Sequence, residues 1–262
     1  MSTDTHIDAL DAAGKALLDA AAEAGPDARV ATCPGWQVRD LLRHTTAVHR
    51  WATTFVVEGH TDYRTAGPET DLDGDALLAY TREGHARLVE ALRAAPADLE
   101  CWAFLPAPSP LAFWARRQTH ETTVHRADAE SALTSGPGAV DPVIAADGID
   151  ELLRGFHARD RSRVRTDGPR TLRVRATDTG DSWTVRLSQE PPRTEHGAAG
   201  PADCELAGPA DRLYLTLWNR LPQDAVTVTG DGSLARLWRE NSAIVWSQSP
   251  QPSQPGRTRP DS

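Results

Sequence analysis

The sequence predicts an α+β protein of two domains, a four-helix bundle followed by a smaller α+β domain. Up to about residue 140, apolar residues recur at three- and four-residue steps in long segments, which is typical of helices. From about residue 170 they alternate with polar residues, as in strands. Stretches that contain Gly and Pro separate the segments. The expected divisions are a first domain over 1–140, a second over 141–246 and a disordered tail over 247–262.

Four long helices are expected in the first domain. The first is rich in Ala and Leu and ends at Gly25-Pro26, because Gly and Pro terminate helices. In the second, Leu41, Val48 and Phe55 lie on one stripe and a neighbouring stripe is also apolar, so this helix should be central in the bundle. The expected helices span residues 7–24, 36–57, 74–94 and 111–133.

The second domain is expected to combine a hairpin with shorter elements. Residues 172–177 and 183–187 alternate between apolar and polar side chains, and the turn between them is Asp178-Thr179-Gly180-Asp181. Beyond residue 246, Ser, Pro, Gln, Gly and charged residues dominate, a composition that disfavours a packed core. Further strands are expected over 204–206 and 225–228, and helices over 144–158, 211–219 and 233–240.

Composition excludes several classes of protein. The chain has 262 residues and a formal net charge of −9, whereas nucleic-acid-binding proteins carry a basic stripe. Its three cysteines are far apart and form no Cys-x-x-Cys pair, so neither a disulfide framework nor a cysteine zinc site is indicated. The N-terminus lacks a basic region followed by an apolar core, and no apolar run approaches the length of a membrane span. We therefore expect a cytoplasmic protein with no nucleic-acid or membrane partner.

Glu121 and His125 are the first candidate metal ligands. They are four residues apart on the expected fourth helix, so their side chains point the same way, one turn apart. His44, on the apolar stripe of the second helix, can supply a third ligand from a facing helix. Two imidazoles and one carboxylate leave positions open for substrate, as in catalytic sites, and suit Zn²⁺ as well as Fe²⁺, Mn²⁺ or Ni²⁺. Asp128 can accept a hydrogen bond from a ligand histidine.

Other interpretations of these residues stay open. A Glu/His pair at this spacing is common on solvated helices without metal, and a histidine on an apolar stripe can be a hydrogen-bonded core residue. His49 is a competing ligand, because its stripe is also apolar. His120 points about 100° away from Glu121 on a helix. One metal therefore cannot take His120, Glu121 and His125 together.

Several motifs occur together and in order, among them a tryptophan-containing turn before the second helix and the Glu/His segment of the fourth. They are Cys33-Pro34-Gly35-Trp36-Gln37-Val38-Arg39-Asp40-Leu41-Leu42-Arg43-His44, His49-Arg50-Trp51, Arg117-Gln118-Thr119-His120-Glu121 and His125-Arg126-Ala127-Asp128-Ala129-Glu130. In these motifs the chain resembles the mycothiol-dependent maleylpyruvate isomerase family, one of the DinB/YfiT-like metal-binding bundles. The remainder resembles the family's C-terminal domain, with the best local match at Val226-Thr227-Val228-Thr229-Gly230-Asp231.

The resemblance implies a DinB-like four-helix bundle that holds zinc through His44, Glu121 and His125. It also implies mycothiol as thiol cofactor or co-substrate, with its sulfur at or near the metal. An arginine in the family's C-terminal domain is implicated in the isomerase, and Arg220 and Arg236 are both possible counterparts.

Three further residues are candidates for contact with substrate or cofactor. His49, Arg50 and Trp51 follow His44 on the second helix and could reach a ligand near the metal. Their alternative interpretation is packing and helix-surface charge.

The expected function is that of an enzyme in which a metal-activated thiolate attacks a small electrophile, because a bound dication deprotonates a thiol. A cis-alkene conjugated to carbonyls, for which the resemblance implies a maleylpyruvate-like substrate, would be isomerised without consumption of thiol. An epoxide or an electrophile that carries a leaving group would instead give S-transfer. Two other classes stay open: a metal-containing module that binds a small molecule without turnover, and a metal-dependent amide or ester hydrolase. The expected partners are a small-molecule electrophile and a low-molecular-weight thiol, and the chain is expected to be a monomer or homodimer.

Overall fold

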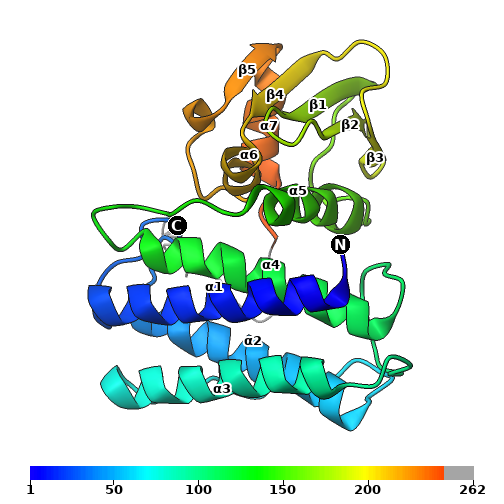
Figure 1. Cartoon of the computed structure of the whole chain (residues 1–262). Helices are drawn as coiled ribbons and strands as arrows, with labels where there is room; N and C mark the ends of the chain where they lie inside the picture. Colours follow the sequence, from blue (N-terminus) through cyan, green and yellow to red (C-terminus); the bar gives the residue numbers. More distant parts are fainter. Residues whose placement is uncertain (245–262) are drawn as a thin grey trace, which may run out of the picture.

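Four long helices form the N-terminal half of the protein (Figure 1). The computed structural model describes residues 1–244. The expected fold class, a helical bundle followed by a smaller α+β part, is confirmed. The helices of the bundle are α1 (Thr3–Ala24), α2 (Val38–Glu58), α3 (Gly74–Ala94) and α4 (Pro110–Glu130).

Local capping residues determine where these helices begin and end. The Ser2 hydroxyl accepts a hydrogen bond from the backbone N–H of Thr5 at 3.1 Å, so α1 begins earlier than expected. The Ser109 hydroxyl does the same for α4, from the N–H of Ala112 at 3.1 Å. Gly59 follows α2 in the left-handed conformation, which glycine adopts without strain.

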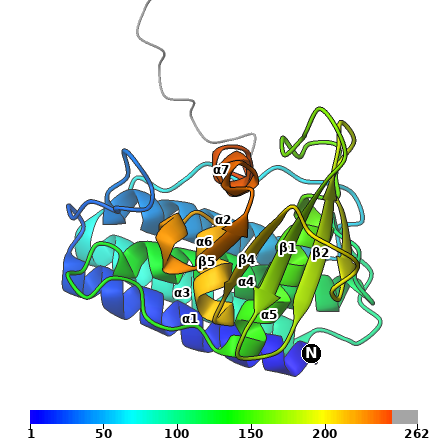
Figure 2. The same ribbon diagram turned by 90° about the horizontal axis from the view of Figure 1, so that it is seen from above.

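Helix α4 is the central helix, which corrects the expectation that the second helix would be central. It packs against α1 and α2 within the bundle, and α5 and α6 cover it on the other side (Figures 1 and 2). Between residues 117 and 129 every side chain except Arg126 is buried. Its apolar periodicity is weak because its contacts are polar. For example, the Thr119 hydroxyl donates to the backbone carbonyl of His6 at 2.7 Å, and His49 bonds to the Thr122 hydroxyl at 2.9 Å.

The C-terminal half is a five-stranded sheet with short helices. The strands lie in the order β3-β2-β1-β4-β5, with β1 parallel to β4 and the other neighbours antiparallel. The strands are β1 (Arg170–Ala176), β2 (Ser182–Leu187), β3 (Arg193–His196), β4 (Cys204–Gly208) and β5 (Thr227–Gly230). The helices are α5 (Pro142–Asp150), α6 (Ala210–Leu217) and α7 (Gly232–Asn241), with a π-helical turn over Glu151–Phe156 and a 3-10 turn over Gln223–Ala225.

The expected hairpin is confirmed as β1 and β2. Leu172 pairs with Val185 and Val174 with Trp183, and all four side chains are buried. Helices α5 and α6 lie between this sheet and the bundle (Figure 1). The alternation seen in the sequence therefore marks the sheet face that packs onto the helices.

Three parts of the C-terminal half differ from expectation. The helix expected over 144–158 changes to π-helical geometry at Glu151. Strand β3 was not expected, because Arg193–His196 has no apolar alternation and stays mostly exposed. The strand expected over 225–228 begins at Thr227, because Gln223–Ala225 forms a 3-10 turn.

Two expectations about the chain's divisions are not tested. The disordered tail expected over 247–262, and the last two residues of the expected second domain, lie outside the described residues. The expected domain boundary at residue 140 stays a prediction.

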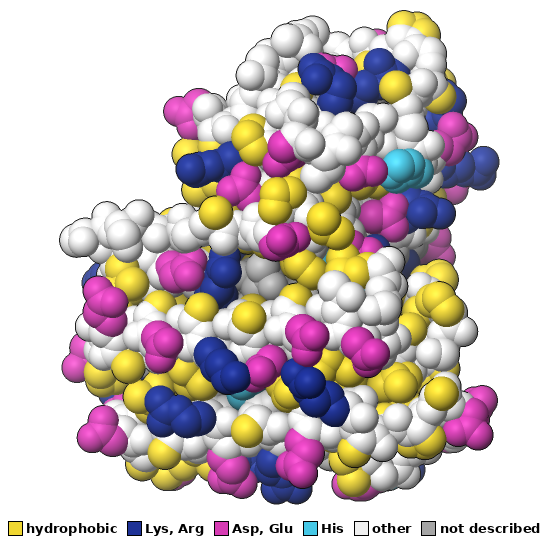
Figure 3. Space-filling view, viewed as in Figure 1, with side chains coloured by type: hydrophobic (Ala, Val, Ile, Leu, Met, Phe, Trp, Pro, Cys, Tyr) yellow, Lys and Arg dark blue, Asp and Glu magenta, His cyan; other side chains and the backbone are white. Residues whose placement is uncertain are grey.

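Two further observations concern the helices and the surface. Within residues 1–244, no helix combines the length and the apolar character needed to cross a bilayer. On the face made by α1 and α3, acidic and basic side chains are interspersed, without a continuous basic stripe (Figure 3).

Candidate metal centre

Three side chains meet between α2 and α4. His44 extends from α2, while Glu121 and His125 lie one turn apart on α4. The Nε2 atom of His125 lies 3.2 Å from Oε1 of Glu121, and the Nε2 atom of His44 lies 3.6 Å from the same oxygen. One possible ligand atom from each residue lies within 4.8 Å of those of the other two. The structure thus brings the three candidate ligands to one point.

Asp128 and Arg220 fix the orientation of His125. Oδ2 of Asp128 accepts a hydrogen bond from Nδ1 of His125 at 2.8 Å. The guanidinium of Arg220 donates to both oxygens of the same carboxylate, at 2.8 and 2.9 Å. Burial acts to raise the pKa of Asp128, but Arg220 and His125 outweigh it and hold that pKa well below its ordinary value. Because Nδ1 is engaged, Nε2 of His125 is left to face Glu121.

Arg117 and Glu151 support Glu121 from the other side. Nη2 of Arg117 lies 3.3 Å from Oε2 of Glu121, and its Nη1 pairs with Glu151 from the π-helical turn. Burial acts to raise the pKa of Glu121, but its bonds to His125 and His44 outweigh burial and keep that pKa well below the ordinary value. Glu121 is therefore held as a carboxylate, the form that binds a cation.

This set of donors fits a divalent cation. Both ring nitrogens of His125 face carboxylate oxygens, one of Asp128 and one of Glu121. Without a cation, this geometry requires a doubly protonated ring. Burial lowers the pKa of His125, but the two carboxylates outweigh burial and raise it to about 9. A dication next to Nε2 would satisfy the same carboxylates with a neutral imidazole, and oxygen and nitrogen donors without thiolate suit Zn²⁺ and other divalent transition metals.

A cavity of about 580 Å³ opens onto two of the three candidate ligands, His44 and Glu121. Polar side chains from α2 and α4 line it, namely Asp40, His44, Arg117, Gln118 and Glu121. Aromatic side chains line it as well, namely Trp36, Trp51, Tyr63 and Phe104. The indole N–H of Trp51 donates to the backbone carbonyl of Arg64 at 2.6 Å, which ties the segment between α2 and α3 to the cavity. The candidate metal centre is therefore reachable by a small molecule.

Two family models match the chain. The model described as the mycothiol maleylpyruvate isomerase N-terminal domain matches residues 7–130, and the model of the MDMPI C-terminal domain matches residues 143–237. The chain belongs to the mycothiol maleylpyruvate isomerase family. Among curated proteins, no sequence matches significantly.

Solved structures share the fold. One, of the mycothiol-dependent maleylpyruvate isomerase, matches with a TM-score of 0.61 at 16% sequence identity, over 87% of this chain and 93% of that chain. A second, of a histidine-to-alanine mutant of a protein with the same description, matches with a TM-score of 0.60 at 14% identity and the same coverage. At these identities the likeness shows the fold alone.

The family resemblance leaves two C-terminal arginines open, and the structure places them differently. Arg220 is bonded to Asp128 and thereby linked to His125. Arg236 is exposed on α7. Of these two arginines, only Arg220 therefore has a contact that leads to the candidate metal centre.

The other candidate contacts on α2 also separate. Trp51 lines the cavity. Arg50 lies over the ring of Tyr80 on α3, 3.7 Å from its centroid, and His49 is buried against Thr122. Neither Arg50 nor His49 is among the residues that line the cavity.

Sequence reasoning did not single out Arg117, Gln118 and Glu151 individually. A signal existed for Arg117, because it lies four residues before Glu121 and so on the same side of α4. No local signal existed for Glu151, because its position depends on the π-helical turn that follows α5.

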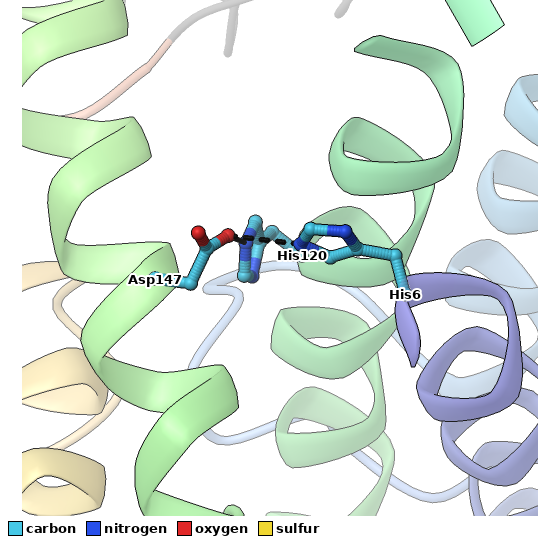
Figure 4. Close-up of side chains that lie close together, drawn as sticks. All are labelled: His6, His120 and Asp147. Atoms are coloured by element: carbon cyan, nitrogen blue, oxygen red, sulfur yellow. Dashed lines mark hydrogen bonds and ion pairs between the residues drawn. The ribbon is translucent and has the colours of Figure 1, made fainter. Parts of the chain in front are cut away.

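A second group of possible ligands lies where α1, α4 and α5 meet (Figure 4). Oδ2 of Asp147 lies 3.0 Å from Nε2 of His6 and 2.8 Å from Nε2 of His120. The guanidinium of Arg116 donates to the same oxygen at 2.7 Å. Since Arg116 already supplies the positive charge, we interpret this group as a link between the bundle and the C-terminal half.

Asp147→Asn is expected to lower the free energy of unfolding by about 2 kcal/mol, because three donors lose a charged acceptor. Burial acts to raise the pKa of Asp147, but His120 and His6 outweigh it and hold that pKa far below its ordinary value. The stabilisation is therefore complete above the unfolded-state pKa of about 3.9 and is lost as the pH falls further. Denaturant unfolding between pH 3 and 7 should show wild type and variant converging at the acidic end; a constant difference would contradict this.

Proposed function

We propose that this protein is a metal-dependent, mycothiol-using enzyme that directs a thiol onto a small conjugated electrophile, giving cis-trans isomerisation or S-transfer. The observation that supports the proposal most is the convergence of His44, Glu121 and His125 beside a cavity large enough for a small molecule. Membership of the isomerase family supports the choice of thiol and of reaction class.

The protein's own residues would bind and orient the reactants. His44, Glu121 and His125 would hold the metal, whose charge, when it is bound, favours the thiolate form of a thiol. Arg220 acts through Asp128 to keep the ring of His125 fixed. The aromatic residues around the cavity would exclude water from the electrophile.

The properties of Cys33 support a small-molecule thiol, rather than a cysteine of the protein, as the nucleophile. Its sulfur lies 3.9 Å from Nη2 of Arg220, which is bonded to Asp128. Burial and the neighbouring Asp128 raise the pKa of the Cys33 thiol to about 12, so it stays protonated at neutral pH. A protonated thiol is a poor nucleophile.

Cys33→Ser is accordingly expected to keep thiol-dependent turnover within about threefold of wild type, because no reacting group is lost. A threefold change in rate corresponds to less than about 1 kcal/mol of activation free energy. The measurement is the initial rate with saturating mycothiol. Loss of turnover in a variant that still binds metal would show that Cys33 takes part in the reaction.

The proposal is tested with zinc-loaded protein, mycothiol and a cis-configured conjugated carbonyl compound. Isomerase activity would give the trans product with no loss of thiol, whereas transferase activity would consume one thiol for each product. The control omits the thiol. Product formation that does not depend on the thiol would instead indicate a hydrolase, and saturable binding without product would indicate a binding module; either result contradicts the proposal.

A further inference from the structure

The cavity offers little unpaired positive charge to a ligand. Among the described residues that line it, Arg117 is the one with a basic side chain other than histidine. That guanidinium is already engaged by Glu151 and Glu121 and is only 2% exposed. Asp40 and Glu69 add two further carboxylates to the lining. A dianionic ligand would therefore exchange water for a cavity rich in carboxylates, which costs free energy.

The charged residues behind the cavity do not make the site positive either. The ion pairs around the metal centre join three carboxylates, those of Glu121, Asp128 and Glu151, to two guanidinium groups, those of Arg117 and Arg220. A bound dication would be offset by this excess of carboxylate and by the thiolate that it favours. The site as a whole therefore has no strong positive field for a substrate with two negative charges.

The aromatic side chains favour a flat ligand. Trp36 lies near the metal centre, with its ring 5.2 Å from that of His44. Trp51 and Tyr63 pack edge to face at 6.5 Å, and both line the cavity. Aromatic faces and edges of this kind bind planar conjugated groups by stacking and edge contacts.

Gln118 supplies a neutral polar contact. Its side chain lines the cavity and is only 1% exposed, yet its Oε1 atom has no hydrogen-bond partner within the protein. A buried amide oxygen without a partner costs free energy, so the arrangement points to a ligand that completes it. A carboxamide can accept a bond from an N–H or O–H group and donate one to a carbonyl, with no need for charge on the ligand.

We propose that the electrophile site takes an uncharged, flat, conjugated carbonyl compound that stacks on the aromatic side chains and bonds to Gln118, rather than a dicarboxylate. The role of this compound as the thiol's target rests on the proposed function, whereas its chemical class follows from the lining alone. The proposed ligand therefore differs in charge from maleylpyruvate, the substrate in the family's name, because maleylpyruvate is a dicarboxylate.

The test is a binding measurement that needs no thiol. Zinc-loaded, full-length protein is titrated by calorimetry at pH 7 with three compounds that share one flat scaffold and differ in charge: cinnamamide, cinnamate and 4-carboxycinnamate. We expect cinnamamide to bind at least ten times more tightly than the dianionic 4-carboxycinnamate. Equal or tighter binding of the dianion, or no binding of cinnamamide, would overturn the inference.

Two variants locate the effect in the cavity. Gln118→Leu keeps the size of the side chain and is expected to weaken cinnamamide binding about tenfold, while the exposed Gln189→Leu serves as the matched control and should change nothing. Glu69→Arg, at an exposed position of the lining, is expected to tighten 4-carboxycinnamate binding about tenfold. Unchanged affinities in both cavity variants, with folding verified by circular dichroism, would contradict the inference.

Failure of the inference and failure of the proposed function can be told apart. If cinnamamide binds as expected but no substrate shows thiol-dependent turnover, the proposed function is wrong and the ligand class stands. If turnover depends on the thiol but is faster for a dicarboxylate than for its neutral diester, the ligand class is wrong and the function stands.

Discussion

His44→Ala is expected to lower the affinity of the protein for Zn²⁺ by about a hundredfold or more, since loss of groups that merely orient ligands already costs 10–100-fold. Of the three residues that converge, His44 alone comes from α2, so without it the metal would keep only the two donors of α4. Thiol-dependent turnover should fall with it at limiting metal. The measurement is competitive titration of apo-protein against a zinc chelator.

His49, the other histidine of α2 considered as a ligand, provides a comparison for this experiment. His49→Ala removes a histidine from the same helix that bonds to Thr122 instead. We expect that variant to keep its metal affinity and to lose stability, whereas His44→Ala, at the half-buried cavity surface, should unfold near the wild-type temperature in the apo form. Retention of metal by His44→Ala together with its loss from His49→Ala would show that the centre is built differently.

Arg117→Ala is expected to cost about 3–5 kcal/mol of unfolding free energy, because it leaves two buried carboxylates without their shared cation. The side chains of Glu121 and Glu151 are 8% and 3% exposed, so water cannot replace the guanidinium well. The same guanidinium lies over the ring of Phe156, 4.9 Å from its centroid, and this contact would be lost too. Thermal unfolding should shift downward by on the order of 10 °C for a protein of this size.

A second substitution tests the stated cause. Glu151→Gln in the Arg117→Ala background neutralises one of the two stranded carboxylates, so the double variant should be more stable than Arg117→Ala alone. Arg87→Ala, at an exposed arginine on α3, is the control and should change stability by no more than about 0.5 kcal/mol. A double variant less stable than either single variant would point to lost packing as the dominant effect.

The bundle could be predicted because its signals are local. Helix α3 begins and ends where its sequence pattern indicates, at Gly74 and Ala94, since the cap at Asp73 and the proline at 96 lie next to it in the chain. The pairing of Glu121 with His125 follows from helix geometry alone. His44 required the further expectation that α2 faces α4, which the bundle pattern and the resemblance both supplied.

The remainder depended on contacts between distant residues. The polar sequence of α4 hid its central position, because burial there is compensated by partners such as Asp147 and Glu151 rather than indicated by an apolar stripe. The π-helical turn that positions Glu151 has no composition of its own. Strand β3 lies at a sheet edge with exposed side chains, so the hydrophobic pattern that marks β1 and β2 is missing from it.

The burial of α4 on all sides also limits whether the bundle can be separated from the C-terminal half or joined to that of another protein. A fragment that ended at residue 140 would remove one charged partner from each of His120, Arg117 and Asp128. Arg117 would keep Glu121, and Asp128 would keep His125. The partners removed are Asp147, Glu151 and Arg220. A chimera that joins this bundle to the C-terminal half of a relative would therefore need the counterparts of all three of these partners. We expect the two halves to evolve as one unit rather than as exchangeable modules.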